Sequence, residues 1–416
     1  MQFEDHGFQP VILGGDITAY SLARTFHEAY RVKSIVVSQV SSHLCADSCI
    51  MENIIVPGME NLETFLSKLA EIGEAHADEK LILLACGDWY VRLIVENRAE
   101  LEKHYIIPYI SEELLNRLVL KDSFYDLCDA NDVPHPKTFV YDVNKPHSLD
   151  GLDIDFPLVA KPASSAAYHY AQFPGKRKVY FFDDRDSLEN MLLNLRTSSY
   201  DHKFLLQELI PGDDTNMRIL TTYSDKNGKV RFAAFGQTLL EDKKAMGIGN
   251  PVAIISRHND EIVADATRLL EALGYTGFAN FDIKVDPRTG KHYFFEINTR
   301  LGRSNYYVTA SGHNVSRWMV EDLVFGNPLP EQMVIAEGDE SLYTVVPKQT
   351  LMDYVTDPQL KEEVKRLYSQ GKATDPIDYA VEEKFIRKIY PRIFMGKQRK
   401  AFKAAFEAER AKGKKA

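Results

Sequence analysis

Hydrophobic and polar positions alternate in two different ways along the chain, and the change falls near residue 120. Before it, the short apolar runs Pro10–Leu13, Ser34–Val37 and Leu81–Cys86 alternate with stretches of helical periodicity at Ile17–Tyr30 and Leu62–Ala77. Apolar runs of this kind, separated by helices, are typical of a parallel sheet with helices on both faces. The pattern therefore predicts an α/β domain in the first part of the chain.

Beyond residue 120 most extended runs follow one another without an intervening helix. The predicted strands are Thr138–Tyr141, Phe156–Lys161, Lys178–Phe182, Phe204–Glu208, Met217–Tyr223, Val230–Thr238, Gly277–Val285 and His292–Ile297, and the predicted helices are Lys121–Asn131, Ser187–Arg196 and Glu261–Leu273. Turn residues at Asp225–Gly228 and Asp286–Gly290 indicate antiparallel hairpins. The overall fold class is therefore α/β followed by α+β.

Two glycine–aspartate sequences follow predicted strands of the first domain. Gly14-Gly15-Asp16 and Gly87-Asp88 stand where parallel strands end, and ligands of such sheets bind outside the carboxyl ends of the strands. The same glycines are equally well explained as tight turns. The first sequence lacks the GxGxxG pattern, so a dinucleotide fingerprint is absent. Both interpretations, site and turn, stay open at this point.

The net charge of −10 argues against a nucleic-acid-binding surface, because binding to a phosphate backbone needs a cationic face. The charge is distributed unevenly: residues 384–416 carry 12 Lys and Arg but two acids, a local net charge of +10. Apolar residues recur near helical spacing in this basic tail, with Pro391 expected to interrupt a helix. Such a segment suits either an anionic membrane surface or packing on the protein with a solvated end.

The cysteine content and the hydropathy of the chain indicate the cellular compartment in which the protein works. Four cysteines in 416 residues do not form a disulfide scaffold. The first residues include acids and lack the apolar core of a secretory signal, and no stretch approaches the roughly 20 apolar residues of a membrane span. We expect a cytoplasmic protein, with the inner face of the membrane as an alternative site of action.

The last predicted hairpin carries the clearest chemistry. In a strand, side chains two residues apart share a face, so pairing of the two strands brings Asp282, Glu296 and Asn298 together. Three oxygen ligands of this kind suit Mg²⁺, which also takes phosphate oxygens and water. The alternative is an ordinary solvated sheet face.

Upstream residues suggest a partner for such an ion. Lys161 ends a buried strand and requires an anion, for which a phosphate would serve, whereas Lys121 at a helix start is ambiguous by itself. The segment Phe204–Gly212 runs from a strand into a turn and is followed by Asp214. Exposed backbone groups there could form hydrogen bonds with the edge of an adenine ring. The carboxylate of Asp214 could accept hydrogen bonds from ribose hydroxyls.

Five motifs in this order resemble one known family. They are Ile12–Asp16, Ala85–Asp88 (ACGD), Gly212–Arg218 (GDDTNMR), Tyr275–Asp282 (YTGFANFD) and Phe295–Arg303 (FEINTRLGR). Together they resemble the D-aspartate ligases of peptidoglycan crossbridge synthesis, within the ATP-grasp superfamily. The resemblance implies a pre-ATP-grasp α/β domain at 1–117, a small lobe at 118–198, a large lobe with the metal site at 199–335 and a C-terminal region at 336–416. The last 85 or so residues carry no functional motif.

The resemblance also implies roles for individual residues. Lys121 and Lys161 correspond to phosphate-binding lysines, and Gln207, Glu208, Leu209 and Ile210 to the adenine-binding hinge, with Gln207 where a glutamate is common. Asp214 corresponds to the ribose-binding acid, and Asp282, Glu296 and Asn298 to the ligands of two Mg²⁺ ions, with Mn²⁺ as an alternative. Lys161, Arg218, Arg300 and Arg303 would act in catalysis, the last two by holding substrate carboxylates. The phosphate-covering loop departs from the glycine-rich family pattern, since Ala163–Lys178 offers Ser164, Ser165 and basic residues instead.

The reaction implied is ATP-dependent ligation through an acyl phosphate, which needs charge neutralisation and positioning but no protein nucleophile. In the family the acid is D-aspartate, activated at its β-carboxyl. The amine is the side-chain amine of the third stem-peptide residue in a UDP-MurNAc-pentapeptide-type or lipid-linked precursor. The alternatives are a ligase for another amino acid or one that makes a free dipeptide, and a catalytically inactive nucleotide-binding regulator.

Overall fold

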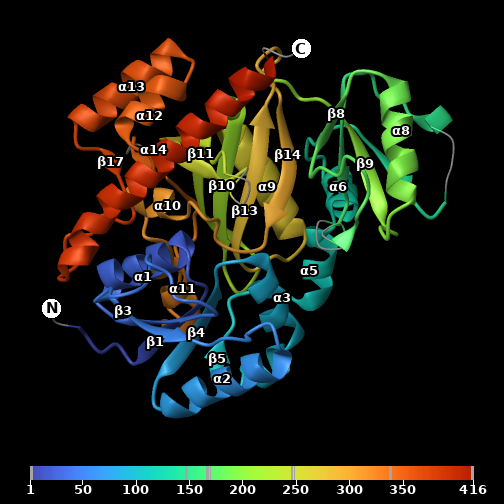
Figure 1. Ribbon diagram of the computed structural model, residues 1–416. Helices are drawn as coiled ribbons and strands as arrows, with labels where there is room; N and C mark the ends of the chain where they lie inside the picture. The colour runs from blue at the N-terminus through green and yellow to red at the C-terminus, as the bar shows by residue number, and fades with distance from the viewer. Residues whose placement is uncertain are drawn as a thin grey trace. The chain divides into compact units, whose positions relative to one another are not determined.

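The computed structural model describes residues 3–145, 149–164, 168, 170–244, 247, 249–336 and 340–413 (Figure 1). The chain divides into two compact units. Unit 1 comprises residues 1–112, 214–280 and 298–416, and unit 2 comprises residues 113–213 and 281–297. Among the described residues, no helix combines the length and apolar character needed to cross a membrane.

A five-stranded sheet in unit 1 confirms the predicted parallel α/β domain. Its strand order is β3-β2-β1-β4-β5, and every recorded pairing is parallel. The strands are β1 (Phe8–Leu13), β2 (Ser34–Ser38), β3 (Met51–Ile55), β4 (Lys80–Ala85) and β5 (Tyr105–Ile106); the helices are α1 (Ile17–Tyr30), α2 (Leu62–Ala75), α3 (Asp88–Glu96) and α4 (Arg98–Leu101). The hydrophobic pattern did not predict β5, α3 or α4, nor β3, which contains the polar residues Glu52 and Asn53.

Gly14 is required by the turn after β1. Its φ is +137°, and a Cβ atom there would lie 2.6 Å from the Cβ of Cys86 at the end of β4. Asp16 then caps α1 by accepting a hydrogen bond from the backbone N–H of Thr18 at 3.0 Å. The Gly14–Asp16 sequence therefore has a structural explanation, close approach of two strand ends followed by a helix cap.

The second sheet has the strand order β14-β13-β10-β11-β12-β16-β17, with β15 pairing with β11. The predicted strands are present as β10 (Met217–Ser224), β11 (Val230–Glu241), β13 (Gly277–Val285) and β14 (His292–Asn298), and prediction missed β12 (Pro251–Arg257), β15 (Val334–Ile335), β16 (Leu342–Thr344) and β17 (Ala373–Thr374). The remaining helices of unit 1 are α9 (Asp260–Ala272), α10 (Tyr306–Ala310), α11 (Val315–Met319), α12 (Lys348–Tyr354), α13 (Pro358–Ser369) and α14 (Phe385–Gly413).

Unit 2 is built around a four-stranded antiparallel sheet of order β6-β9-β7-β8. The strands are β6 (Thr138–Asp142), β7 (Leu158–Pro162), β8 (Tyr180–Phe182) and β9 (Lys203–Glu208), accompanied by α5 (Glu112–Val119), α6 (Lys121–Ala130) and α8 (Arg185–Arg196). Leu188, Leu192 and Leu195 of α8 pack on Leu158 and Phe204 of the sheet, all at most 3% exposed. The repeat of three and four residues in α8 explains this packing.

The C-terminal helix corrects one expectation. Pro391 does not interrupt the basic tail, because α14 runs through it as a single helix from Phe385 to Gly413 (red in Figure 1). A proline this close to the start removes one internal hydrogen bond, and its ring is buried. Further along, Phe406 stacks on Tyr354 of α12 with ring centroids 4.1 Å apart. The helix is therefore packed on the protein along much of its length.

A buried ion pair anchors the start of α14 to the N-terminal domain. Glu382 and Arg387 are each 2% exposed and 3.3 Å apart. The Glu382 carboxylate also accepts hydrogen bonds from the hydroxyls of Tyr20, at 2.9 Å, and Ser48, at 2.6 Å. Arg387 donates to the carbonyl oxygen of His43 at 2.9 Å. These contacts hold the pKa of Glu382 below its usual range although burial opposes this.

Breaking this pair should destabilise the protein strongly. Glu382→Gln keeps the shape of the side chain but leaves the Arg387 charge buried without its counter-ion, which we expect to lower the free energy of unfolding by about 3 kcal/mol. Urea unfolding followed by circular dichroism measures the change. Glu383→Gln, at the exposed neighbouring position, is the matched control. Equal stability of the two variants would contradict the anchoring role.

Candidate active site

The hairpin of β13 and β14 places two predicted metal ligands in unit 2. Asp282 lies on β13 and Glu296 on β14, and the Asp282 side chain is one of the groups that lower the pKa of Glu296. The ammonium of Lys121, the first residue of α6, lies 2.8 Å from Oε2 of Glu296. Lys121 is the main cause that holds the pKa of Glu296 well below its usual range, against the effect of burial. The Glu296 side chain keeps 39% of its surface exposed, so it is accessible to a ligand.

Lys161 of β7 joins the same group of charges. Its Nζ atom lies 3.2 Å from the hydroxyl of Tyr125 and 5.5 Å from the ring centre of Phe295. Burial, and then the like charge of Lys121, lowers the pKa of Lys161 to about 7, while Glu296 opposes the shift. Two ammonium groups that repel one another in a partly dry site form a receptor for a multiply charged anion.

The donor set suits a hard divalent cation beside such an anion. Carboxylate oxygens of Asp282 and Glu296 and the amide oxygen of Asn298, two residues further along β14, are the ligand types that Mg²⁺ prefers. In the part of the chain that the structure describes, no group of three or more His, Cys, Asp or Glu side chains could hold a metal. An ion held by these residues would therefore complete its shell with phosphate oxygens and water, as Mg²⁺ usually does.

The predicted hinge, Gln207–Ile210, spans the end of β9 in unit 2 and the two residues after it. Gln207 is buried, and its Nε2 donates to the Thr138 hydroxyl at 2.7 Å. Glu208 Oε1 accepts from the backbone N–H of Lys137 at 2.8 Å. Both side chains thus fasten β9 to the segment around β6, and Leu209 and Ile210 continue without regular secondary structure. A nucleotide at this point would meet the backbone of the hinge, since these two side chains are engaged.

Two further predicted residues, Asp214 and Arg218, lie in unit 1. Asp214 forms an ion pair with Lys243 at 2.8 Å and accepts from the backbone N–H of Glu241. Arg218 of β10 donates to the carbonyl oxygens of Thr215 and Met217. Burial and the nearby charge of Arg257 lower the pKa of Arg218 to about 10.

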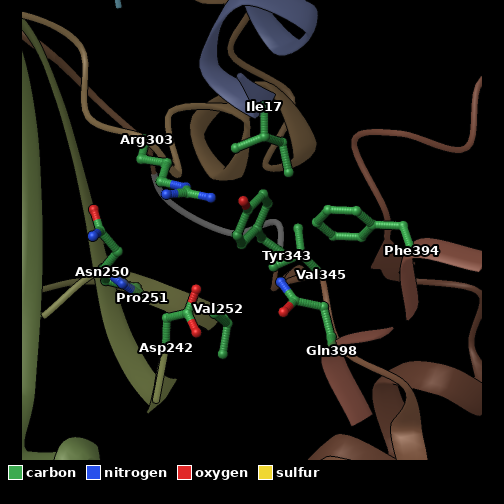
Figure 2. Close-up of a pocket in the computed structure, with 10 residues that line it drawn as sticks. All are labelled: Ile17, Asp242, Asn250, Pro251, Val252, Arg303, Tyr343, Val345, Phe394 and Gln398. Atoms are coloured by element: carbon green, nitrogen blue, oxygen red, sulfur yellow. The ribbon is translucent and has the colours of Figure 1, made fainter. Parts of the chain in front are cut away.

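The two arginines after β14 have different surroundings, although the sequence treats them alike. Arg300 binds Asp88 through two parallel hydrogen bonds of 2.7 and 3.0 Å, so its guanidinium is already paired with a carboxylate. Arg303 lines a small pocket in unit 1 (Figure 2), and no hydrogen bond or ion pair is recorded for it among the described residues. Of the two, only Arg300 has a carboxylate partner among the described residues.

Sequence reasoning missed Tyr125 and left the partner of Asp88 unassigned. The Tyr125 hydroxyl donates to the carbonyl oxygen of Phe295 at 2.8 Å and contacts Lys161, so it ties α6 to β14 and β7. Its place four residues after Lys121, on the same helix face, was the available signal. Of the two serines expected in the phosphate-covering loop, Ser164 is among the described residues and Ser165 lies outside them.

Comparison with known proteins identifies the family. The family model "Carbamoyl-phosphate synthase L chain, ATP binding domain" matches residues 244–329. The chain is 35% identical to the D-aspartate ligase of Enterococcus faecium over 388 residues, which is 90% of this chain and 91% of that protein. The chain belongs to the D-aspartate ligase family of the ATP-grasp superfamily. It is accordingly an ATP-dependent ligase that forms C–N bonds.

Solved structures support the ATP-grasp fold. The L-amino acid ligase of Bacillus licheniformis aligns with a TM-score of 0.54 and 15% identity, covering 77% of this chain and 75% of that one. The biotin carboxylase domain of the Hydrogenobacter thermophilus 2-oxoglutarate carboxylase, in complex with MgADP, ADP and bicarbonate, aligns with a TM-score of 0.57 and 12% identity, covering 79% and 72%. Sequence identities of 12–15% show that this chain has the same fold as these two proteins, and nothing about a shared activity.

Replacing Lys161 should separate stability from nucleotide binding. Lys161→Met removes a partly buried charge beside Lys121, so we expect the ligand-free protein to gain about 1 kcal/mol of stability. The same change should abolish the rise in melting temperature that MgATP produces in the parent protein. Thermal unfolding with and without MgATP measures both effects, and Lys145→Met, at an exposed position of unit 2, is the control. An undiminished MgATP shift would exclude Lys161 from the nucleotide site.

Proposed function

We propose that this ligase joins D-aspartate, through its β-carboxyl group, to the side-chain amine of the third stem-peptide residue of a peptidoglycan precursor. The identity of 35% to a D-aspartate ligase over 90% of the chain is the observation that carries the proposal. The acceptor is a UDP-MurNAc-pentapeptide-type or a lipid-linked precursor. The reaction takes place in the cytoplasm.

The proposed reaction has two steps that balance without a protein nucleophile. A carboxylate oxygen of the acid attacks the γ-phosphorus of ATP, which breaks the bond to ADP and gives an acyl phosphate. The amine then attacks the acyl carbon, phosphate leaves, and the ammonium proton is lost as the amide forms. Lys121, Lys161 and Arg218 offset the negative charge of the phosphates, which is the main demand of phosphoryl transfer.

Magnesium fits the carboxyl and amide groups of the β13–β14 hairpin. Asp282, Glu296 and Asn298 would hold it, and Mg²⁺ would neutralise charge on the phosphate oxygens. Two ions are expected, with Mn²⁺ as the alternative. In the ligand-free chain Lys121 balances the charge of Glu296 at 2.8 Å. The hinge Gln207–Ile210 is assigned to adenine and Asp214 to ribose.

An amino-acid screen tests the substrate directly. Phosphate release from MgATP in the presence of the precursor should be stimulated at least tenfold by D-aspartate and little by L-aspartate or other amino acids. Glu296→Gln, which removes the charge but keeps the shape of the side chain, should lower this release at least a hundredfold and so controls for contaminating ATPases. Phosphate release with a different amino acid only would show that the enzyme is a ligase for that amino acid. A free dipeptide as product would show that the acceptor is an amino acid and not the precursor.

We further propose that the start of α14 contacts the membrane where lipid-linked precursors are found. Phe385, Ile386 and Ile393 are 77%, 45% and 41% exposed, and exposed basic residues such as Lys388 and Arg392 lie between them. Apolar side chains beside cationic ones match the interface of an anionic leaflet.

Vesicle binding tests this contact. The protein should sediment with vesicles of phosphatidylglycerol but not with those of phosphatidylcholine, and added salt should weaken the binding. The double variant Phe385→Ser, Ile393→Ser should lower the affinity at least tenfold. A matched variant of an exposed apolar residue elsewhere, Leu193→Ser, should bind as the parent does. Sedimentation that ignores lipid charge would refute the contact.

A further inference from the structure

Tyr125 of α6 holds the side chain of Lys161 in unit 2. The Tyr125 hydroxyl lies 2.8 Å from the carbonyl oxygen of Phe295 and 3.2 Å from Nζ of Lys161. A carbonyl oxygen can only accept a hydrogen bond, so the hydroxyl proton points to Phe295 and an oxygen lone pair faces the ammonium group. The chemistry of the three groups therefore settles the direction of both hydrogen bonds.

The Lys161 ammonium also lies near two aromatic rings. Its Nζ atom is 5.5 Å from the ring centre of Phe295 and 5.8 Å from that of Tyr125, within the range of cation–π attraction. Among the described residues, the Tyr125 hydroxyl is the one hydrogen-bond acceptor recorded for this ammonium group. An ammonium group has further donors, and these stay available to an anionic ligand.

The helix that supplies Tyr125 also carries a charge that pushes the ammonium away. Lys121 is the first residue of α6, and its like charge acts against that of Lys161. The spacing of four residues puts Lys121 and Tyr125 on one face of the helix. Repulsion between the two ammonium groups favours rotamers of Lys161 that point away from Lys121. The Tyr125 hydroxyl opposes this by offering an acceptor.

Tyr125 is itself held in place, as a residue that orients another must be. It is 3% exposed, and its ring stacks on that of His135, with the centroids 4.8 Å apart and 13° between the planes. The two ring nitrogens of His135 each lie 2.9 Å from an acceptor, the carbonyl oxygen of Pro136 and Oδ1 of Asp129. The ring that carries the hydroxyl is therefore packed against a ring that is fixed on both sides.

We propose that Tyr125 is a positioning residue of the ligase, which holds the Lys161 ammonium where the phosphates of ATP bind. The inference rests on the proposed function, because that function assigns Lys161 to the phosphates. A free lysine side chain adopts many rotamers, and ordering it during binding lowers affinity. Tyr125 orders it beforehand, so the positive charge is in place when negative charge develops on the leaving ADP.

Tyr125→Phe tests this role, since it keeps the ring and its stacking but removes the hydroxyl. Phosphate release with precursor, and with the amino acid that the substrate screen identifies, gives kcat/KM for ATP. We expect the variant to lower kcat/KM for ATP about 10- to 100-fold, the effect of losing a hydrogen bond to a charged group. The KM values for the amino acid and the precursor should stay within about twofold, because the contact of Lys161 is with ATP.

Tyr141→Phe is the matched control. Tyr141 is a buried tyrosine of the same unit, and its hydroxyl accepts a hydrogen bond from another cationic side chain, that of Arg196. It belongs to the hydrophobic cluster that includes the buried leucines of α8. Loss of its hydroxyl should lower the melting temperature, as Tyr125→Phe does, but leave kcat/KM for ATP within about twofold of the parent value.

A second variant keeps the test independent of the folding of Tyr125→Phe. His135→Leu removes the stacked ring and leaves the Tyr125 hydroxyl present but less firmly held. It should lower kcat/KM for ATP about 3- to 10-fold. Melting temperatures of all variants verify that they are folded.

A double-mutant cycle with Lys161→Met shows whether Tyr125 acts through the lysine. In the Lys161→Met protein, Tyr125→Phe should lower kcat/KM for ATP by less than about twofold, because the group that it orients is gone. Release of labelled phosphate makes the low activity of these variants measurable. A tyrosine that only supports the fold would cause the same loss with either residue at position 161.

The outcomes separate the inference from the function on which it rests. A parent protein that releases no phosphate with any amino acid, or a fully active Lys161→Met, overturns the proposed function and the inference with it. An impaired Lys161→Met beside a Tyr125→Phe that behaves like Tyr141→Phe overturns the positioning role alone. Equal losses from Tyr125→Phe in both backgrounds also overturn it. Only a loss that depends on Lys161 supports the proposal.

Discussion

The ion pair between Lys121 and Glu296 is the interaction around which the candidate site of unit 2 is organised. It joins the first residue of α6 to β14, and at 2.8 Å it compensates a carboxylate that also neighbours Asp282. The same lysine repels Lys161 and lowers the pKa of Lys161 to about 7. The ion pair thus keeps Glu296 ionised, and it leaves the charge of Lys161 incompletely balanced. A polyphosphate with its cation relieves both conditions, since it brings negative charge to the lysines and positive charge to the carboxylates.

The other candidate site residues lie close together because they follow one another in a short stretch of the chain. Glu296, Asn298, Arg300 and Arg303 follow one another within eight residues, from the end of β14 into the segment before α10. Strand periodicity gives the first two a common face, whereas the irregular segment after them gives each arginine different surroundings. Arg300 is held by Asp88, and Arg303 lines the pocket beside Tyr343.

Residues on regular strands and helix starts were predictable from the sequence, and residues placed by tertiary packing were not. Lys161, Asp282 and Glu296 stand out because charge at the end or on the face of an otherwise buried strand needs an explanation. The difference between Arg300 and Arg303 is invisible in the sequence, since it depends on Asp88, over 200 residues away. Pro391 misled the prediction for a similar reason: burial of its ring offsets the single lost hydrogen bond, and burial is a property of the fold.

The same reasoning applies to α14, whose position is set by tertiary contacts although no sequence motif marks it. Glu382 and Arg387 fix the start of α14 against Tyr20 and His43. A helix rises about 1.5 Å per residue, so Gln398 lies about 16 Å beyond Arg387 along a stiff rod. The buried ion pair therefore sets where the amide of Gln398 comes to rest, although the pair itself is remote from the pocket. Because the anchor contacts the N-terminal domain, Ile17 of that domain and Phe394 of α14 line the same pocket.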